Sequence, residues 1–388
     1  MKAPRLIIAL AIASLGSGLS LEAQQPSPSV STGFGVDTTV ADVRDIVSLV
    51  RAYLAQPDTS ARARGLWTTS TEFDRRVGDI GAGQTKQGFP ATVVGVISTP
   101  GDSVYVVKIL YARADSAAGI APLALERLYA IRDARAPFRF KLASAFPRVT
   151  RDWERRSKGP LTFVYAPGQR PNPTRIDSAA RFVDSVARLF DVPAPAHLDV
   201  IVGQSMDDVM RGLGLDFFIE PSGPGVRSGG RTLGPLLLVG NPDIGEAYYH
   251  EFVHAILGSH LRAGSLLLAE GVATWLGGSR GRTPAQMYGA VYRYQREDST
   301  LTFTGLFRKG FELNDPLRAS DLLYGTGALI ANAVFQKHGI GAVRRLYQST
   351  GDNETMLREI ARALDLPVDN PRALDRWWRQ EASARATH

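Results

Sequence analysis

The pattern of apolar residues changes from a helical to a strand period along the first part of the chain. Between residues 38 and 56, apolar side chains recur every three or four positions, which predicts an amphipathic helix. A second helical segment is expected at about 60–77. Four segments rich in Val, Ile, Leu, Tyr and Phe follow, separated by turn sequences, and are predicted to be consecutive strands: 91–98, 103–112, 122–132 and 137–145. Residues 37–150 are therefore expected to form a small α+β domain with a curved antiparallel sheet.

This order of helices and strands resembles the nuclear-transport-factor-2-like (NTF2-like) or cystatin-like architecture. The resemblance lies in the order of the elements, and it implies a curved sheet beside the first helices. The charged segment "RDWERRSKGP" of residues 151–160 follows the last of these strands. We place the boundary between two domains within this segment.

The second domain, expected over residues 155–385, opens with a strand, a helix and another strand. "LTFVYAP" at 161–167 and "HLDVIVG" at 197–203 have strand composition, and apolar residues at helical spacing lie between them. "PLLLVG" at 235–240 is predicted to be a buried or edge strand, and a helix is expected to follow "NPD" at 241–243. The remainder is predicted to be mainly helical, with helices at about 265–277, 284–297, 325–338, 340–348, 353–364 and 371–384. The predicted fold class is thus α+β.

The N-terminus has the pattern of a secretory signal peptide. Two basic residues, Lys2 and Arg5, precede an apolar segment from Leu6 to Leu15 that is too short to span a bilayer. Small residues follow, and we expect cleavage after Ala23, so that 1–23 is the signal peptide. The Pro/Ser/Gly-rich residues 24–36 are expected to be a flexible leader. The protein is therefore expected to be exported, periplasmic or secreted, with no membrane span after cleavage.

Composition narrows the possible chemistry of this 388-residue chain. It contains no cysteine, which excludes disulfides, a thiol nucleophile and thiolate metal ligands. The formal net charge is +7, but the basic residues are scattered and no nucleic-acid-binding motif accompanies them. We therefore expect a solvated surface and no nucleic-acid partner.

The candidate chemistry lies in "GEAYYHEFVHAILGSH", residues 245–260. His250 and His254 are four residues apart on a predicted helix, so both imidazoles can bind one metal ion. Glu251 is the next residue round the helix, beside an open coordination position. There it can take a proton from the attacking water and pass it to the leaving amine. This His-Glu-x-x-His pattern is typical of zinc metalloproteases and predicts a zinc ion.

Two residues are candidates for the third protein ligand. His260 has the histidine spacing of metzincins, but their pattern has glycine three residues before the last histidine, and this chain has Leu257 there and Gly258 next. Glu270 is the better candidate. It lies in the apolar helical segment "SLLLAEGVATWLGG" (265–278), where a carboxylate needs a metal or a base as partner. Gly271 and Ala273 are small, as where two helices pack closely.

"YYHEFVHAIL" followed by "LLLAEGVATWL" resembles the gluzincins, and among them the peptidase-MA-like group related to thermolysin and the M1 aminopeptidases. The resemblance implies a zincin-like domain, with a mixed sheet, the active-site helix and a mainly helical C-terminal part. It also implies that His250, His254 and Glu270 bind Zn²⁺ and that Glu251 is the general base. In "SDLLYGTGALIANAVFQKHG" (320–339), it implies that Tyr324 donates a hydrogen bond to the oxyanion of the tetrahedral intermediate.

The function predicted from the sequence is therefore that of a zinc-dependent metallopeptidase acting on a peptide or protein. The resemblance also implies that substrate lies along an edge strand before the active-site helix, and 235–240 is the local candidate. Two alternatives remain at this point. One is a metzincin-type peptidase with His260 as third ligand. The other is a catalytically inactive peptide-binding module on a peptidase fold.

Overall fold

The computed structural model describes residues 30–56, 60–71, 89–101, 103–115, 119–219, 229–234 and 236–386. These residues divide into two compact units. The first contains the described residues up to Glu154 and those from Asp207 onward that precede Ser222; the second contains Arg155–Met206 and the described residues after Ser222. The predicted signal peptide, 1–23, lies outside the described residues.

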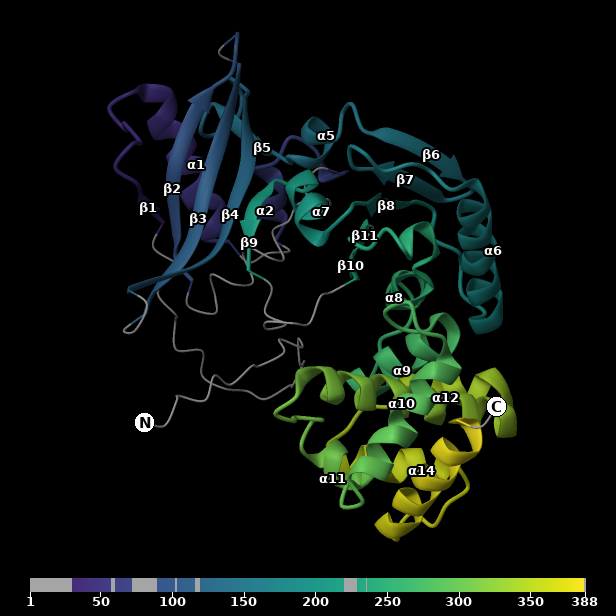
Figure 1. Ribbon diagram of the computed structural model, residues 1–388. Coiled ribbons are helices and arrows are strands. Elements are labelled where there is room, and N and C mark those ends of the chain that lie inside the picture. Colours follow the sequence, from purple (N-terminus) through teal and green to yellow (C-terminus); the bar gives the residue numbers. More distant parts are fainter. Residues whose placement is uncertain are drawn as a thin grey trace. The chain divides into compact units, whose positions relative to one another are not determined.

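The first unit is built on a six-stranded sheet with the order β1-β2-β3-β4-β5, in which β9 also pairs with β4. Neighbouring strands from β2 to β5 are antiparallel, and β1 is parallel to β2. Helix α1 packs against β2 and β5, and its buried side includes Ile46, Val47 and Val50 (Figure 1). The elements are β1 (Ser31–Thr32), α1 (Ala41–Leu54), α2 (Ala61–Gly65), β2 (Ala91–Ser98), β3 (Val104–Asp115), β4 (Gly119–Arg132), β5 (Phe140–Ala143), α5 (Phe146–Val149), α7 (Met206–Gly212) and β9 (Leu215–Phe218). The four strands predicted from the sequence are all present.

Two features of this unit were not expected from the sequence. Ser31 and Thr32, in the segment predicted to be a flexible leader, pair with β2. Residues 207–219, within the range predicted for the second domain, are grouped with the first unit. The reason is that β9 pairs with β4, with Phe217 opposite Leu125. This pairing gives the backbone N–H and C=O groups of β9 their hydrogen-bond partners.

The second unit contains a mixed five-stranded sheet with the order β10-β11-β8-β7-β6. Strands β7, β8 and β11 are parallel, and helix α6 connects β7 to β8. Strand β10 runs antiparallel to β11 and forms one edge of this sheet. The bounds are β6 (Glu154–Lys158), β7 (Leu161–Tyr165), α6 (Pro173–Phe190), β8 (Leu198–Val202), β10 (Gly230–Leu233) and β11 (Leu236–Val239).

The expectation that 235–240 could be the substrate-binding edge strand is wrong. Leu236–Val239 forms β11, which pairs with β10 on one side and β8 on the other, so its backbone groups are already bonded. All four of its residues are buried. Among the described residues, the edge on this side of the sheet is β10.

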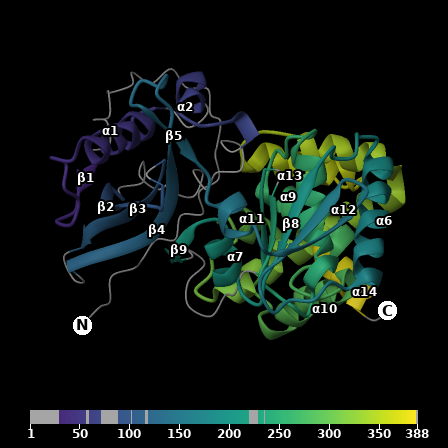
Figure 2. The same cartoon turned by 90° about the horizontal axis from the view of Figure 1, so that it is seen from above.

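The rest of the second unit is helical, as predicted. Its elements are a 3₁₀ turn η1 (Gly245–Ala247), α8 (Tyr249–Gly258), α9 (Leu266–Gly277), α10 (Pro284–Glu297), α11 (Phe303–Arg308), α12 (Pro316–Gln348), α13 (Asn353–Ala363) and α14 (Pro371–Ala386). Helices α9 and α12 pack against each other and lie side by side in Figure 2. Helix α10 packs against both. Within α12, Gly339 has a non-helical backbone (φ 71°), which explains why the sequence predicted two shorter helices there.

The apolar core of the second unit joins the sheet to α6 and to the helices that follow. Trp378 of α14 is fully buried in it and donates a hydrogen bond from its indole N–H to Thr326 Oγ1 at 3.0 Å. Across the described residues, the helices are too short or too polar to span a bilayer.

Candidate metal centre

Helix α8 carries both histidines of the motif on one side. His250 lies in its first turn and His254 one turn later, and their Nε2 atoms are 3.1 Å apart. The neighbouring α8 residues Phe252, Val253 and Ile256 are buried in the core. This packing fixes the orientation of the helix and turns the histidine side toward α9.

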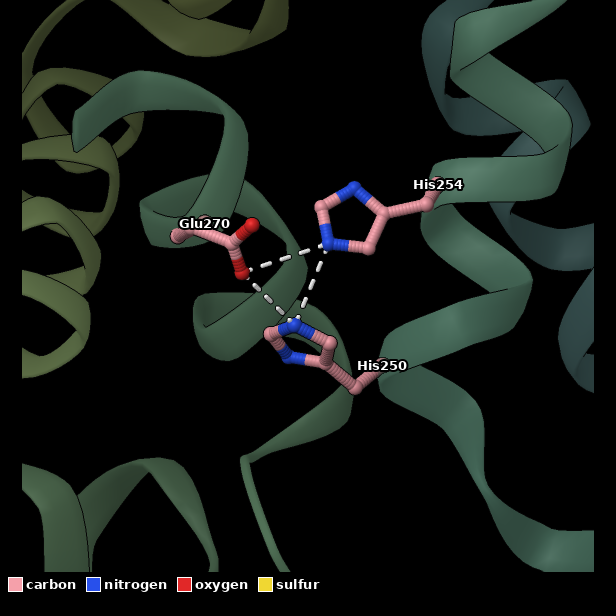
Figure 3. Close-up of side chains that lie close together, drawn as sticks. All are labelled: His250, His254 and Glu270. Atoms are coloured by element: carbon pink, nitrogen blue, oxygen red, sulfur yellow. Dashed lines mark hydrogen bonds and ion pairs between the residues drawn. The ribbon is translucent and has the colours of Figure 1, made fainter. Parts of the chain in front are cut away.

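Helix α9 supplies the third group. Ser265 caps its N-terminus by accepting a hydrogen bond from the Leu268 amide at 3.3 Å, so Glu270 falls in the second turn. Glu270 Oε2 lies 3.0 Å from His250 Nε2 and 3.4 Å from His254 Nε2. Figure 3 shows the carboxylate pointing between the two imidazole rings.

The three donor atoms have the spacing that a zinc ion requires. Ligand atoms 2.0–2.1 Å from a tetrahedral zinc lie about 3.3 Å from one another, and the three distances here are 3.0, 3.1 and 3.4 Å. Two imidazoles and a carboxylate are also a known donor set for catalytic zinc, which keeps a further position open. The side chains of His254 and Glu270 are 21% and 16% exposed and that of His250 4%, so the cluster is reachable from solvent on one side. These residues therefore fit a zinc ion.

The other nitrogen of His250 is held by the backbone. His250 Nδ1 lies 2.8 Å from the carbonyl oxygen of Gly278, and donation to this carbonyl leaves the Nε2 lone pair free for a metal. Gly278 ends α9 with φ 72°, a conformation that favours glycine. The preceding residue, Gly277, has no room for a side chain, because a Cβ atom there would lie 2.5 Å from the His250 amide nitrogen. The end of α9 thus packs directly on the start of α8.

In the metal-free cluster, the proton lies on His254. Burial by itself lowers the pKa of His254, but the charge of Glu270 and its hydrogen bond outweigh this and raise that pKa to about 9. Burial alone would raise the pKa of Glu270, but the charge of His254 and the hydrogen bond from its imidazolium hold it well below its usual range. An imidazolium therefore faces a carboxylate at neutral pH, and a dication can replace its proton.

Glu251 belongs to the same electrostatic environment. Its charge contributes to the raised pKa of His254, and its side chain is mostly buried. One carboxylate oxygen, Oε2, accepts a hydrogen bond of 2.8 Å from the hydroxyl of Thr232 on β10. Glu251 is therefore next to the candidate metal site and is held by a residue from the edge strand.

Two tyrosines flank His250. The ring of Tyr324, from α12, lies 5.6 Å from the ring of His250, and that of Tyr248 lies 6.5 Å away on a stacked face. The pKa of Tyr324 is raised well above its usual value, mainly by burial and next by the charge of Glu270. Burial, with the charge of Glu251 second, does the same for Tyr248. Both hydroxyls are therefore protonated at neutral pH and can donate a hydrogen bond.

An ion cluster supports Tyr324. Asp321, one turn earlier on α12, is buried and pairs with Arg280 at 2.6 Å and also with Arg282. The guanidinium carbon of Arg280 lies 5.5 Å from the centroid of the Tyr324 ring. Asp321 thus forms ion pairs with two arginines, and these pairs connect the turn after α9 to the start of α12.

His260 lies apart from the cluster. Helix α8 ends at Gly258, and His260 follows as an exposed residue whose amide donates to the Leu257 carbonyl. The helix therefore continues through Leu257, where the metzincin pattern has glycine. Among the described residues, the group of donor atoms that could hold a metal contains Glu270 and not His260.

Sequence reasoning missed three contacts in this site. The Gly278 carbonyl orients His250, Thr232 contacts Glu251, and Tyr248 lies beside His250. Tyr248 directly precedes the helix that carries the motif and could have been considered for that reason. Thr232 and Gly278 belong to segments that meet α8 only in the folded chain, so no local pattern marks them.

No protein-family model matches this sequence, and no curated protein matches it significantly. Among solved structures, the chain is similar to an M1 zinc metallopeptidase from Deinococcus radiodurans, with 16% identity and a TM-score of 0.34, covering 75% of this chain and 63% of that one. A mutant of the M1 zinc metallopeptidase from the same organism, bound to a Tyr-Ser-Ala substrate, gives 15% identity and a TM-score of 0.34, covering 76% and 62%. This chain thus spans less than two thirds of the length of these similar structures.

Proposed function

We propose that this protein is a zinc-dependent metallopeptidase in which His250, His254 and Glu270 hold the ion. The observation that carries the proposal is the triangle of donor atoms, with sides of 3.0, 3.1 and 3.4 Å, that α8 and α9 build together. The backbone contact from His250 Nδ1 to the Gly278 carbonyl supports the same reading, since metal-binding histidines are usually oriented in this way.

Zinc, when bound, acts as a Lewis acid that activates water and polarises the carbonyl of the scissile peptide. Glu251 is then the general base. It takes a proton from the attacking water on the open side of the cluster and delivers it to the leaving amine. Because it directly follows His250 on α8 and is not among the three clustered donors, its carboxylate would lie beside a bound ion without being a ligand.

Tyr324 is proposed to stabilise the oxyanion that develops in the transition state. Its raised pKa keeps the hydroxyl protonated, so that it can donate a hydrogen bond to negative charge. The ring lies beside His250, and the Asp321 ion cluster holds the start of α12 in place. Tyr248 is the second tyrosine beside His250, but its ring packs against the backbone of Gly230.

The substrate is proposed to be an extended peptide or protein segment. Among the described residues, β10 is the last strand on its side of the sheet and lies next to α8, so an added strand would pair there. Pairing at this edge would bring a substrate backbone close to the general base, because Thr232 of β10 contacts Glu251. The same pairing with β11 is blocked by its two neighbours.

The test uses the full-length protein after purification. Metal analysis should find about one zinc per chain, removable by a chelator, and the zinc-loaded protein should cleave members of a mixed peptide library. Glu251→Gln should retain zinc and lose cleavage. A protein that neither contains nor rebinds zinc would refute the proposal, and so would a zinc-loaded wild type that cleaves no peptide.

Export to the periplasm or the medium is part of the proposal. It rests on the basic, apolar and small residues of 1–23. Cell fractionation followed by N-terminal sequencing should find the mature protein outside the cytoplasm, beginning near residue 24. An uncleaved protein confined to the cytoplasm would contradict it.

A further inference from the structure

We propose that Thr232 is a positioning residue that holds the carboxylate of Glu251 in the orientation needed for proton transfer. The inference rests on the proposed function, because it assigns a role within the same site. It concerns a residue on β10, which is 19 positions away from Glu251 in the sequence and on a different element.

The contact is directed at the carboxylate. Thr232 Oγ1 lies 2.8 Å from Glu251 Oε2 and 3.0 Å from the Glu251 backbone carbonyl. A hydroxyl has one proton to donate, and a charged carboxylate is a stronger acceptor than a neutral carbonyl. Thr232 therefore donates mainly to Oε2. The other oxygen, Oε1, is left to accept a proton from water.

Glu251 depends on such a partner. The residue is only 8% exposed, so its carboxylate has lost most of its contact with bulk water. A buried carboxylate without a hydrogen bond is costly, and a glutamate has three side-chain torsions that can turn it away from the reacting water. A misplacement of about 1 Å can cost about 100-fold in rate. A hydrogen bond that fixes Oε2 therefore also fixes the position of Oε1, which accepts the proton.

Thr232 is itself in a fixed place. Its backbone pairs with Leu237 of β11, and its branched Cβ restricts the torsion that aims the hydroxyl. Two residues earlier, a Cβ atom on Gly230 would lie 2.0 Å from the ring of Tyr248, so the strand lies directly against the residue that precedes α8. The position of β10 relative to the first turn of α8 is thus set by contacts that do not involve the Thr232 hydroxyl. Removing this hydroxyl should therefore leave the strand in position.

The experiment compares three variants of the zinc-loaded full chain. Thr232→Val keeps the shape and removes the hydroxyl, and we expect kcat to fall by about 10- to 100-fold, with zinc content and KM within about twofold of wild type. Thr232→Ser restores the hydroxyl and should recover most of kcat. Thr274→Val is the matched control, since Thr274 is buried in α9 and its Oγ1 has no hydrogen-bond partner among the described residues. Its kcat should equal that of wild type.

The outcomes separate this inference from the proposed function. If wild type and Thr274→Val cleave peptides and Thr232→Val cleaves equally well, the role of Thr232 is refuted and the metallopeptidase stands. Loss of zinc in Thr232→Val, or no recovery with Thr232→Ser, also refutes it. Should the wild type bind zinc without cleaving peptides, the proposed function fails. Crystal structures of wild type and Thr232→Val then decide the point: a displaced Glu251 carboxylate supports the inference, and an unmoved one overturns it.

Discussion

Gly271 of α9 and Gly327 of α12 meet backbone to backbone. A Cβ atom placed on Gly271 would lie 2.5 Å from the Cα atom of Gly327, and one placed on Gly327 would lie 2.2 Å from the carbonyl oxygen of Leu267. The contact is one residue beyond Glu270, the candidate metal ligand of α9. The separation of α9 and α12 therefore sets the position of the carboxylate relative to the histidines of α8.

Gly271→Ala should lower both stability and zinc affinity. The added methyl meets backbone, which cannot rotate away, so the helices must separate, at a cost of about 1–3 kcal/mol. Glu270 moves with α9, and zinc affinity should fall by about tenfold or more. Thermal unfolding of the metal-free protein and a competition titration against a zinc chelator measure the two effects.

Gly289→Ala is the matched control for this substitution. Gly289 lies within α10, and a Cβ atom there would meet nothing within 4 Å. Alanine should raise stability by roughly 0.5–1 kcal/mol through its higher helix propensity and leave zinc affinity unchanged. Equal behaviour of the two alanine variants would contradict the close approach of α9 and α12.

Glu251→Gln should distinguish the role of a general base from that of a zinc ligand. The amide preserves the size of the side chain but cannot accept a proton, so the variant should bind one zinc per chain and lose turnover by about 100-fold or more. Zinc analysis and peptide cleavage on the same preparation measure this. Loss of zinc together with activity would show that Glu251 is a ligand instead.

The choice of third ligand can be tested by a pair of variants. Glu270→Ala removes one of the three clustered donor atoms, and zinc affinity should fall at least about 10- to 100-fold. His260→Ala changes an exposed side chain beyond the end of α8 and should bind zinc almost as tightly as wild type. Both are titrated against a zinc chelator. If His260→Ala is the variant that loses zinc, the assignment of Glu270 is wrong.

Zinc binding should release a proton near neutral pH. The pKa of His254 in the metal-free protein is about 9, because the charge of Glu270 outweighs the effect of burial, so His254 is protonated at pH 7. Zinc needs the neutral imidazole, and its apparent affinity should rise about tenfold per pH unit up to about pH 9 and then level off. Calorimetry at pH 7 in buffers of different ionisation enthalpy should find about one proton released per zinc. An affinity that does not change between pH 6.5 and 8.5 would contradict this protonation state.

Much of the local structure follows from the sequence, because it depends on neighbours along the chain. The strands at 91–98 and 122–132 were predicted from their composition and turns, and β2 and β4 occupy nearly the same residues. Thr283 and Gln286 form a capping box at the start of α10, and this helix begins at residue 284 as predicted. The four-residue spacing of His250 and His254 likewise ensures that any helix places them on one side.

Only the tertiary structure decided which separate segments meet. Strand β9 pairs with β4 although about 90 residues separate them, and β11 is internal because β10 covers its outer side. Strand pairing and helix packing bring together segments that lie far apart in the chain. The local pattern of a segment is compatible with many partners, so it does not determine which one the segment meets. Sequence could therefore identify a glutamate in need of a partner at position 270. The close approach of Gly271 and Gly327, together with the packing of Gly277 on α8, decides that this partner is the histidine pair.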